Sequence, residues 1–331
     1  MPWRQTTDPY RIWISEIILQ QTRVAQGYDY YLRFIEHFPR VEDLAAASED
    51  EVLRLWQGLG YYSRARNLHA AAKSIVKAGR FPDDYVGVRQ LKGVGDYTAA
   101  AICSIAYQLP YAVVDGNVYR VLARYFGMDV PIDTTEGKKQ FAALATELLD
   151  RHRPGLYNSA IMDFGALQCK PTSPSCQDCP LQGSCMACRQ QLTEKLPVKA
   201  RRTAIAERFF VYLLVDNGES LLLHRRSAKD IWKGLYEPLL FEFTKAPSEQ
   251  EILAAFADRL PGFPLVFSAE PYALKHVLTH RMLHLVFYSV KATAAASKCI
   301  PMENDQWVRH DDLDNHAMPK AVLKALSHFS V

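Results

Sequence analysis

The 331-residue sequence contains no apolar run as long as the roughly 18–20 residues that a membrane-spanning helix needs. Its N-terminus also lacks the charged and then apolar pattern of a secretion signal. Internal repeats and low-complexity tracts are absent as well. These absences exclude a membrane-spanning protein, and they favour a soluble protein of the cytoplasm that makes no contact with a membrane.

Positive and negative residues are nearly equal in number. The chain has 39 Lys and Arg residues against 36 Asp and Glu residues, which gives a formal net charge of +3. A weakly basic protein of this kind can bind nucleic acid, but binding depends on where its Lys and Arg side chains are placed. Hydrophobic residues make up 49% of the sequence, and its length is sufficient for two compact domains.

Cysteine is present in a pattern that a disulfide framework does not explain. Four of the seven cysteines form a C-x6-C-x2-C-x5-C run, which favours a reducing compartment and a metal centre. One interpretation is an iron–sulfur cluster. The other is a zinc site made from Cys176, Cys179, Cys185 and Cys188. Zinc modules usually separate their cysteine pairs by about 12–20 residues, so the short spacing favours the cluster. The ligands would be Cys169, Cys176, Cys179 and Cys185.

The spacing of the hydrophobic residues divides the chain into two halves. From Asp8 to about Leu167 they recur at helical intervals, with Pro and Gly between the segments, which predicts an all-α half. A polar, basic stretch from Arg189 to Arg202 follows the cysteines and is typical of a linker.

The second half has the pattern of an α+β domain. Its β-rich runs 209–215 and 220–223 flank Asn217-Gly218, a strong hairpin signal. Further strands are predicted at 239–243 and 283–290, and a helix at 249–260. We therefore predict a helical domain at 1–186, a basic interdomain linker at 187–206 and an α+β domain at 207–331.

A glycine-rich turn, Leu91-Lys92-Gly93-Val94-Gly95, lies between two predicted helices. Gly93 and Gly95 allow a tight turn with exposed amide N–H groups at the positive end of the next helix, a geometry that binds a DNA phosphate. The alternative is an ordinary connection between helices. Downstream, Asp115 is placed to cap the helix that begins there.

Glu16 borders an apolar face of a predicted helix. Its neighbours at three and four positions are Ile12, Trp13, Leu19 and Gln20. A carboxyl group in such surroundings loses solvation, which raises its pKa as a general acid requires.

These motifs resemble those of one enzyme family. The cysteine run is similar to the iron–sulfur loop of the endonuclease III superfamily of DNA repair glycosylases, and the 91–95 turn resembles its helix-hairpin-helix. The segment from Pro9 to Thr22 is similar to the catalytic helix of the MutY-type adenine DNA glycosylases, and this likeness covers nearly the whole chain. It implies an N-terminal all-α helix-hairpin-helix glycosylase fold with a [4Fe–4S] loop and a C-terminal α+β Nudix-like domain.

The resemblance also implies a role for individual residues. Glu16 would protonate the leaving adenine and Asp115 would stabilise the oxocarbenium-like sugar. Arg4 and Ser159 stand where the family contacts adenine, although Ser159 replaces a larger amide or carboxyl side chain. The residues that would enter the duplex and contact the base opposite adenine are Gln21, Thr22, Leu59 and Tyr61.

Tyr97 occupies a position at which the bifunctional relatives carry a nucleophilic Lys. A phenol cannot form the Schiff base through which that Lys acts, so the resemblance implies a monofunctional glycosylase that leaves an abasic site.

The second half resembles the Nudix-like domain that recognises the lesion in this family. Its helix at 252–260 lacks the run of Glu residues that a Nudix hydrolase needs for Mg²⁺. Thr279 and His280 match a segment that reads 8-oxoguanine. The implied partner is double-stranded DNA with adenine opposite 8-oxoguanine or guanine, bound by a monomer. Two alternatives are a glycosylase for mismatched or damaged pyrimidines and a non-catalytic iron–sulfur protein; Tyr97 argues against the first, and the presence of both carboxyl residues against the second.

Overall fold

The computed structural model describes residues 1–200, 205–227, 230–292 and 304–331. The chain divides into two compact units, of which the first comprises 1–46 and 67–202 and the second 47–66 and 203–331. Arg201 and Arg202 of the predicted linker lie outside the described residues.

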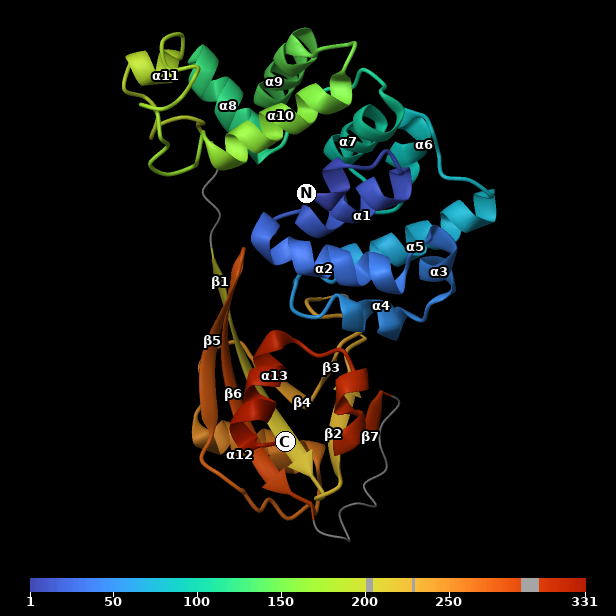
Figure 1. The fold of residues 1–331 in the computed structure, drawn as a ribbon. Helices are drawn as coiled ribbons and strands as arrows, with labels where there is room; N and C mark the ends of the chain where they lie inside the picture. The colour runs from blue at the N-terminus through green and yellow to red at the C-terminus, as the bar shows by residue number, and fades with distance from the viewer. Residues whose placement is uncertain (201–204, 228–229, 293–303) are drawn as a thin grey trace. The chain divides into compact units, whose positions relative to one another are not determined.

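The first unit is helical, as predicted for this half of the chain (Figure 1). α5 begins in the second unit and continues into the first. The helices of the first unit are η1 (Pro2–Arg4), α1 (Pro9–Leu19), α2 (Val24–His37), α3 (Val41–Ala46), α5 (Ser63–Ala78), α6 (Tyr85–Gln90), α7 (Asp96–Tyr107), α8 (Gly116–Phe126), α9 (Thr135–Leu148), α10 (Pro154–Leu167) and α11 (Met186–Arg189).

Helix α1 lies in the core of the first unit. The Asp8 carboxylate caps its start by accepting a hydrogen bond from the backbone N–H of Tyr10 at 2.9 Å, and Pro9 is tolerated in the first turn because no helical N–H is needed there. Trp13, Ile14 and Ile18 are fully buried. α1 packs on α7, and α10 packs on both α7 and α8.

Two glycines allow α10 to approach its neighbours closely. A Cβ atom at Gly155 would lie 2.6 Å from the carbonyl oxygen of Ser104 in α7, and one at Gly165 would lie 2.7 Å from Cβ of Asn117 in α8. Any side chain at either position would therefore push α10 away from the helices that carry the site described below.

Part of the basic stretch after the cysteines packs on the helical unit. Leu196 is only 5% exposed. The backbone N–H of Ile132 donates to the carbonyl of Val198 at 3.0 Å, and the N–H of Ala200 donates to the Asp133 carboxylate at 2.8 Å. The segment up to residue 200 thus contributes to this unit as well as leading out of it.

The second unit is built on a seven-stranded sheet. Its main path runs β3-β2-β1-β6-β5, with β4 also paired to β1 and β7 to β2. The elements of this unit are α4 (Glu49–Leu55), β1 (Ala206–Asp216), β2 (Ser220–Arg225), β3 (Tyr236–Glu237), β4 (Leu239–Phe243), α12 (Glu249–Arg259), β5 (Tyr272–Leu278), β6 (Arg281–Lys291), β7 (Asp305–Arg309), η3 (His310–Asn315) and α13 (Lys320–Phe329).

The central strand β1 is buried on both faces from Phe210 to Val215. The odd-numbered side chains of this run pack in one core with Phe256 of α12. On the opposite face, Tyr212 stacks on Phe287 of β6 at 4.9 Å, and Tyr272 of β5 continues this layer to α13. Because both faces are covered, the part of β1 from Phe209 to Val215 is continuously apolar.

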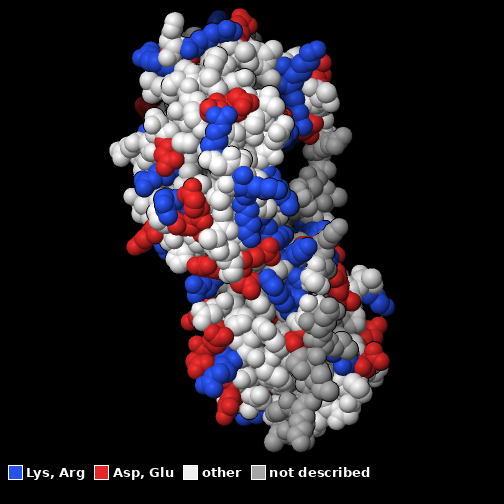
Figure 2. All heavy atoms as spheres, turned by 90° about the vertical axis from the view of Figure 1, so that its right-hand side faces the viewer, with Lys and Arg blue, Asp and Glu red and all other residues white. Residues whose placement is uncertain are grey.

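Charged residues are mixed on the surface. On the face drawn in Figure 2, Lys and Arg side chains are interspersed with Asp and Glu side chains, in keeping with the small net charge. Among the described residues, no helix combines the length and the apolar character that crossing a membrane requires.

Candidate active site

Glu16 is a buried acid on α1. It is 5% exposed, and its flanking residues Ser15 and Ile17 are also buried. Burial raises the pKa of Glu16 above its ordinary value, because the charged form loses its hydration. The sequence predicted this direction from the apolar neighbours.

Tyr97 on α7 is the direct partner of Glu16. Its hydroxyl donates a hydrogen bond to Oε2 of Glu16 at 2.6 Å and lies 3.3 Å from the sulfur of Met162 on α10. Burial and the Glu16 carboxylate raise the pKa of Tyr97 well above its ordinary value, so the phenol keeps its proton and remains a donor. This donor favours the ionised form of Glu16, which opposes the effect of burial without overcoming it.

Asp115 is the N-cap residue of α8. Its Oδ1 accepts the backbone N–H groups of Asn117 and Val118 at 2.9 and 2.8 Å, and its Oδ2 accepts the Asn117 side-chain amide at 2.8 Å. Burial raises the pKa of Asp115, whereas these donors and the Arg120 cation lower it. The capping role predicted from the sequence is confirmed, and it orients the carboxylate.

One cavity joins these residues. Its walls come from α1, from the turn between α6 and α7, and from the starts of α7 and α8. Asp115 also perturbs Glu16 electrostatically, since its negative charge raises the pKa of Glu16. The predicted site residues that line this cavity are Glu16, Gln21, Gly93, Gly95, Tyr97 and Asp115.

The two glycines of the turn have different roles. Gly93 has φ +84°, and a Cβ atom there would lie 2.7 Å from Cβ of Asn67. A side chain at this position would therefore be strained and would also clash. Gly95 caps α7 in an extended conformation, and a Cβ atom there would meet nothing within 4 Å. A side chain at Gly95 would therefore meet no steric obstacle.

Arg4 is anchored to α10. Its Nη1 donates to Oγ of Ser159 at 3.0 Å, and its Nη2 pairs with the Asp163 carboxylate at 3.1 Å. Ser159, whose role the sequence left open, is therefore a partner of Arg4. Sequence reasoning missed Asp163, although it follows Ser159 by four residues and so lies on the same helix face. The Arg4 charge lowers the pKa of Glu16 and the Asp163 charge raises it.

The residues predicted to enter the duplex belong to both units. Gln21, in the first unit, follows α1 with φ +56°, and the Thr22 hydroxyl donates to the carbonyl of Gln20 at 3.3 Å. In the second unit, Leu59 is 8% exposed, whereas Tyr61 is 45% exposed with φ +48°.

Thr279 and His280 form the exposed turn between β5 and β6. The Tyr61 and Thr279 hydroxyls are hydrogen-bonded to each other. Sequence reasoning missed what supports this turn: Arg281, the first residue of β6, pairs with Asp230 at 2.7 Å, and Asp230 also binds Arg208 at 2.6 Å. On α12, Glu251 closes a capping box with Ser248.

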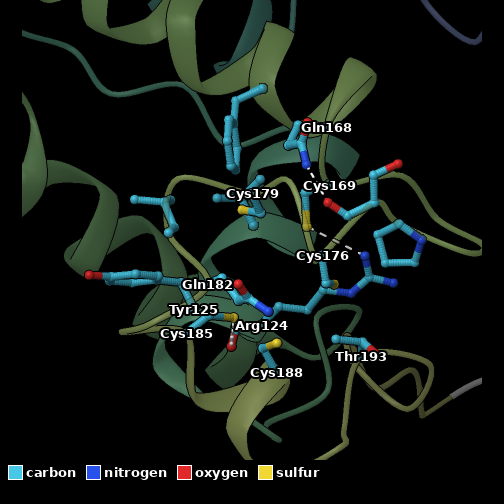
Figure 3. A pocket seen from close by; sticks show the side chains of 15 residues that line it. Arg124, Tyr125, Gln168, Cys169, Cys176, Cys179, Gln182, Cys185, Cys188 and Thr193 are labelled. Atoms are coloured by element: carbon cyan, nitrogen blue, oxygen red, sulfur yellow. Dashed lines mark hydrogen bonds between the residues drawn. The ribbon is translucent and has the colours of Figure 1, made fainter.

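The clustered cysteines surround a second cavity (Figure 3). In this view the side chains of the four predicted ligands and of Cys188 point toward a common space, and all five are free thiols. In the described residues, no group of three or more His, Cys, Asp or Glu side chains is arranged to hold a single metal ion. In a [4Fe–4S] cluster each thiolate binds a different iron, so the ligands surround the cluster and do not meet at one point.

Arg124 fixes the walls of this cysteine cavity. Its guanidinium is buried and donates to the carbonyls of Lys170, Pro171 and Leu196 at 2.6, 3.0 and 3.1 Å. It also donates to Sγ of Cys169 at 3.4 Å, while the Cys185 thiol donates to the Arg124 carbonyl at 3.4 Å. Cysteine ligands beside the buried Arg124 cation fit a thiolate-bound cluster, which is an anion.

This chain is similar to adenine DNA glycosylases along nearly its whole length. An adenine DNA glycosylase of Buchnera aphidicola is 30% identical over 99% of this chain and 93% of its own length. The chain belongs to the adenine DNA glycosylase family. The mouse adenine DNA glycosylase is 32% identical, with 98% of this chain and 74% of the mouse protein covered. The family resemblance inferred from the motifs is thus confirmed.

Domain and structure matches agree with this membership. The HhH-GPD superfamily of base excision DNA repair proteins matches residues 14–150, which include both carboxyl residues and Tyr97, and the NUDIX domain matches 210–328. The structure of a thermostable thymine-DNA glycosylase is 31% identical with a TM-score of 0.53 and covers 57% of this chain and 88% of that chain. The predicted combination of a helical glycosylase fold and a Nudix-like domain is confirmed.

Proposed function

We propose that this protein is a monofunctional DNA glycosylase that removes adenine opposite 8-oxoguanine or guanine in double-stranded DNA. The observation that carries the proposal is the cavity in which buried Glu16, its donor Tyr97 and the capping carboxylate Asp115 lie together. Family membership supports the same activity. A monomer acting in the cytoplasm is part of this proposal.

Each carboxyl group has one step in the proposed reaction. Glu16, whose protonated form is favoured by burial, donates its proton to the adenine as the C1′–N9 bond breaks, and the bond's electron pair leaves with the base. Asp115 stabilises the positive charge that develops on the sugar. Water then adds to C1′ and gives up a proton, which returns Glu16 to its acid form, and the products are free adenine and an abasic site. Adenine must be flipped out of the duplex to enter the cavity.

Tyr97 determines that the reaction stops at the abasic site. The residue that faces Glu16 is a phenol with a retained proton, which cannot form an imine with C1′. Borohydride should therefore trap little enzyme–DNA adduct. Strong trapping of the native protein would show that an amine elsewhere acts as a nucleophile.

The four cysteines Cys169, Cys176, Cys179 and Cys185 fit a [4Fe–4S] cluster, because they line one cavity beside the buried Arg124 cation. When bound, the cluster would hold the loop in shape and take no part in excision. Purified protein should be brown and contain about four irons per chain. Stoichiometric zinc without iron in protein prepared without oxygen would refute this assignment.

The exposed turn of Thr279 and His280 is proposed to read the base opposite adenine. A polar contact to a group that 8-oxoguanine has and guanine lacks should discriminate by about 1–3 kcal/mol. Thr279→Val removes only the hydroxyl and should narrow the rate ratio between the two mispairs. Thr244→Val, at an exposed site of the same unit, is the matched control and should leave the ratio unchanged. Equal ratios in all three proteins would show that discrimination lies elsewhere.

The deciding experiment uses duplexes that hold adenine opposite 8-oxoguanine, guanine or thymine. The proposal expects alkali-labile sites in the adenine strand of the first two. A fourth duplex holds thymine opposite guanine. Release of thymine from it, with adenine left intact in the other three, would instead support the alternative of a mismatched-pyrimidine glycosylase, to which the thymine-DNA glycosylase likeness of the helical unit points.

A further inference from the structure

The cysteine cavity contains one thiol more than a [4Fe–4S] cluster needs. Cys169, Cys176, Cys179, Cys185 and Cys188 all line it, and Figure 3 shows all five side chains directed to the same space. Four of them follow the spacing on which the cluster assignment rests. The position of the fifth, Cys188, decides what it can do.

Cys185 and Cys188 lie on the same turn of helix. Cys185 is the N-cap of α11 and Cys188 is the third residue of that helix, so they are three positions apart and share one face. The turn is held in place because Ala187 between them is fully buried and its carbonyl accepts the N–H of Leu192 at 2.8 Å. Both sulfur atoms are thus presented at the same corner of the cavity.

The turn that carries Cys176 and Cys179 differs in another respect. These two residues are also three positions apart, on a turn closed by a 3.2 Å backbone hydrogen bond, but both belong to the four-cysteine spacing. Cys169 follows the end of α10. Among the described cysteines that line the cavity, Cys188 alone lies outside that spacing, and its neighbour on the same turn is Cys185.

We propose that Cys188 is a reserve ligand for the iron that Cys185 binds. Cys188 would take the place of Cys185 as a ligand: the Cys188 thiol would give up its proton, and the Cys185 thiolate would take one up. The number of thiolates and the oxidation state of the cluster are unchanged. The inference rests on the cluster assignment above and extends it to a residue outside the four-cysteine spacing.

The test measures iron content, the visible absorption of the cluster and thiol protection in single and double variants. Cys185→Ser should retain about four irons per chain, because Cys188 takes over the vacant corner. Cys179→Ser serves as the matched control. It should lose the cluster, because the other thiol on that turn, Cys176, is itself an assigned ligand and no spare thiol is left. Cys188→Ser should keep the cluster, and the double variant Cys185→Ser/Cys188→Ser should lose it.

Alkylation followed by peptide mapping locates the exchange. In the native protein Cys188 should be modified and Cys185 protected, whereas in Cys185→Ser the Cys188 thiol should become protected. Loss of iron from Cys185→Ser to the same extent as from Cys179→Ser, with the native protein loaded, would overturn the reserve role alone. Iron-free native protein would instead overturn the cluster assignment, and the reserve role with it. Circular dichroism of each variant identifies a general loss of fold.

Discussion

Substitution of Glu16 by Gln tests the proposed acid with little change in shape. Gln has the same length, and its carbonyl oxygen can still accept the 2.6 Å hydrogen bond from the Tyr97 hydroxyl. The amide cannot deliver a proton to adenine. The variant therefore removes the acid and keeps the contact that positions the side chain.

The expected loss in rate is large. General acid catalysis contributes typically about 10²–10⁴-fold, which corresponds to about 2.7–5.4 kcal/mol of activation free energy at 1.36 kcal/mol per factor of ten. Because Glu16 is buried in the cavity and is the one acidic residue of α1, we expect a loss within this range. Binding of the mispair should persist.

The same substitution should change the dependence of stability on pH. The pKa of Glu16 is raised in the folded protein above its ordinary value of 4.5, so the folded state holds the proton more tightly than the unfolded state. Glu16 therefore lowers the free energy of unfolding as pH rises from about 4.5 through its folded pKa. Gln has no such effect, so the variant should become more stable relative to the native protein over that window.

Single-turnover excision from a duplex with adenine opposite 8-oxoguanine measures the rate, and melting curves at several pH values measure stability. Glu36→Gln, at an exposed position of the same unit, is the matched control and should change neither. A near-native rate for Glu16→Gln would remove Glu16 from the acid role. A stability difference that is the same at every pH would refute the buried-acid argument.

Three further substitutions test the surroundings of the acid. Tyr97→Phe removes a donor that favours ionised Glu16, so the pKa of Glu16 should rise and the alkaline fall of the excision rate should move to higher pH; an unmoved pH profile would contradict this. Asp163→Asn removes a negative charge that raises the pKa of Glu16, and it also frees Arg4, whose charge lowers that pKa. The alkaline fall of the excision rate should therefore move to lower pH. A shift to higher pH would be inconsistent with the ion pair between Arg4 and Asp163. Asp115→Asn keeps a side chain that can cap α8 and should abolish most excision. Its thermal stability should change by less than the roughly 0.5–2 kcal/mol expected for Asp115→Ala. Excision that survives in Asp115→Asn but is lost in Asp115→Ala would mean that Asp115 acts only as a cap.

Features set by neighbouring residues could be predicted from the sequence. The hairpin expected at Asn217-Gly218 is present, since β1 and β2 pair in antiparallel fashion with Asp216 opposite Leu221. The predicted strand at 239–243 coincides with β4, and the predicted helix at 249–260 matches α12 to within one residue. In each case turn chemistry or periodicity over about ten residues carries the information.

Pairings between distant segments left no such signal. β1 pairs in parallel with β6, so that Ala206 lies opposite Arg281, and neither segment carries a mark of its partner. Burial on both faces also made β1 continuously apolar from Phe209 to Val215, which hid its period of two residues. Strands β5 and β7 were not predicted either, because strand preference depends strongly on what a strand packs against. Helix α13 was not predicted, although its buried residues Ala321, Val322, Ala325 and Leu326 recur at helical spacing.

The active site depends on both kinds of information. The local sequence predicted that Glu16 borders an apolar face and that Asp115 caps a helix, and each prediction is confirmed. That Tyr97 donates to Glu16 across 81 positions, and that Arg4 reaches Asp163 across 159, follows only from the packing of α1, α7 and α10. The family resemblance identified Tyr97 by the Lys it replaces, whereas the structure shows its hydrogen bond to Glu16. The pH dependence of catalysis is therefore the property that the sequence alone could least predict, because the donors and charges that set the pKa of Glu16 come from three separate helices and the N-cap of a fourth.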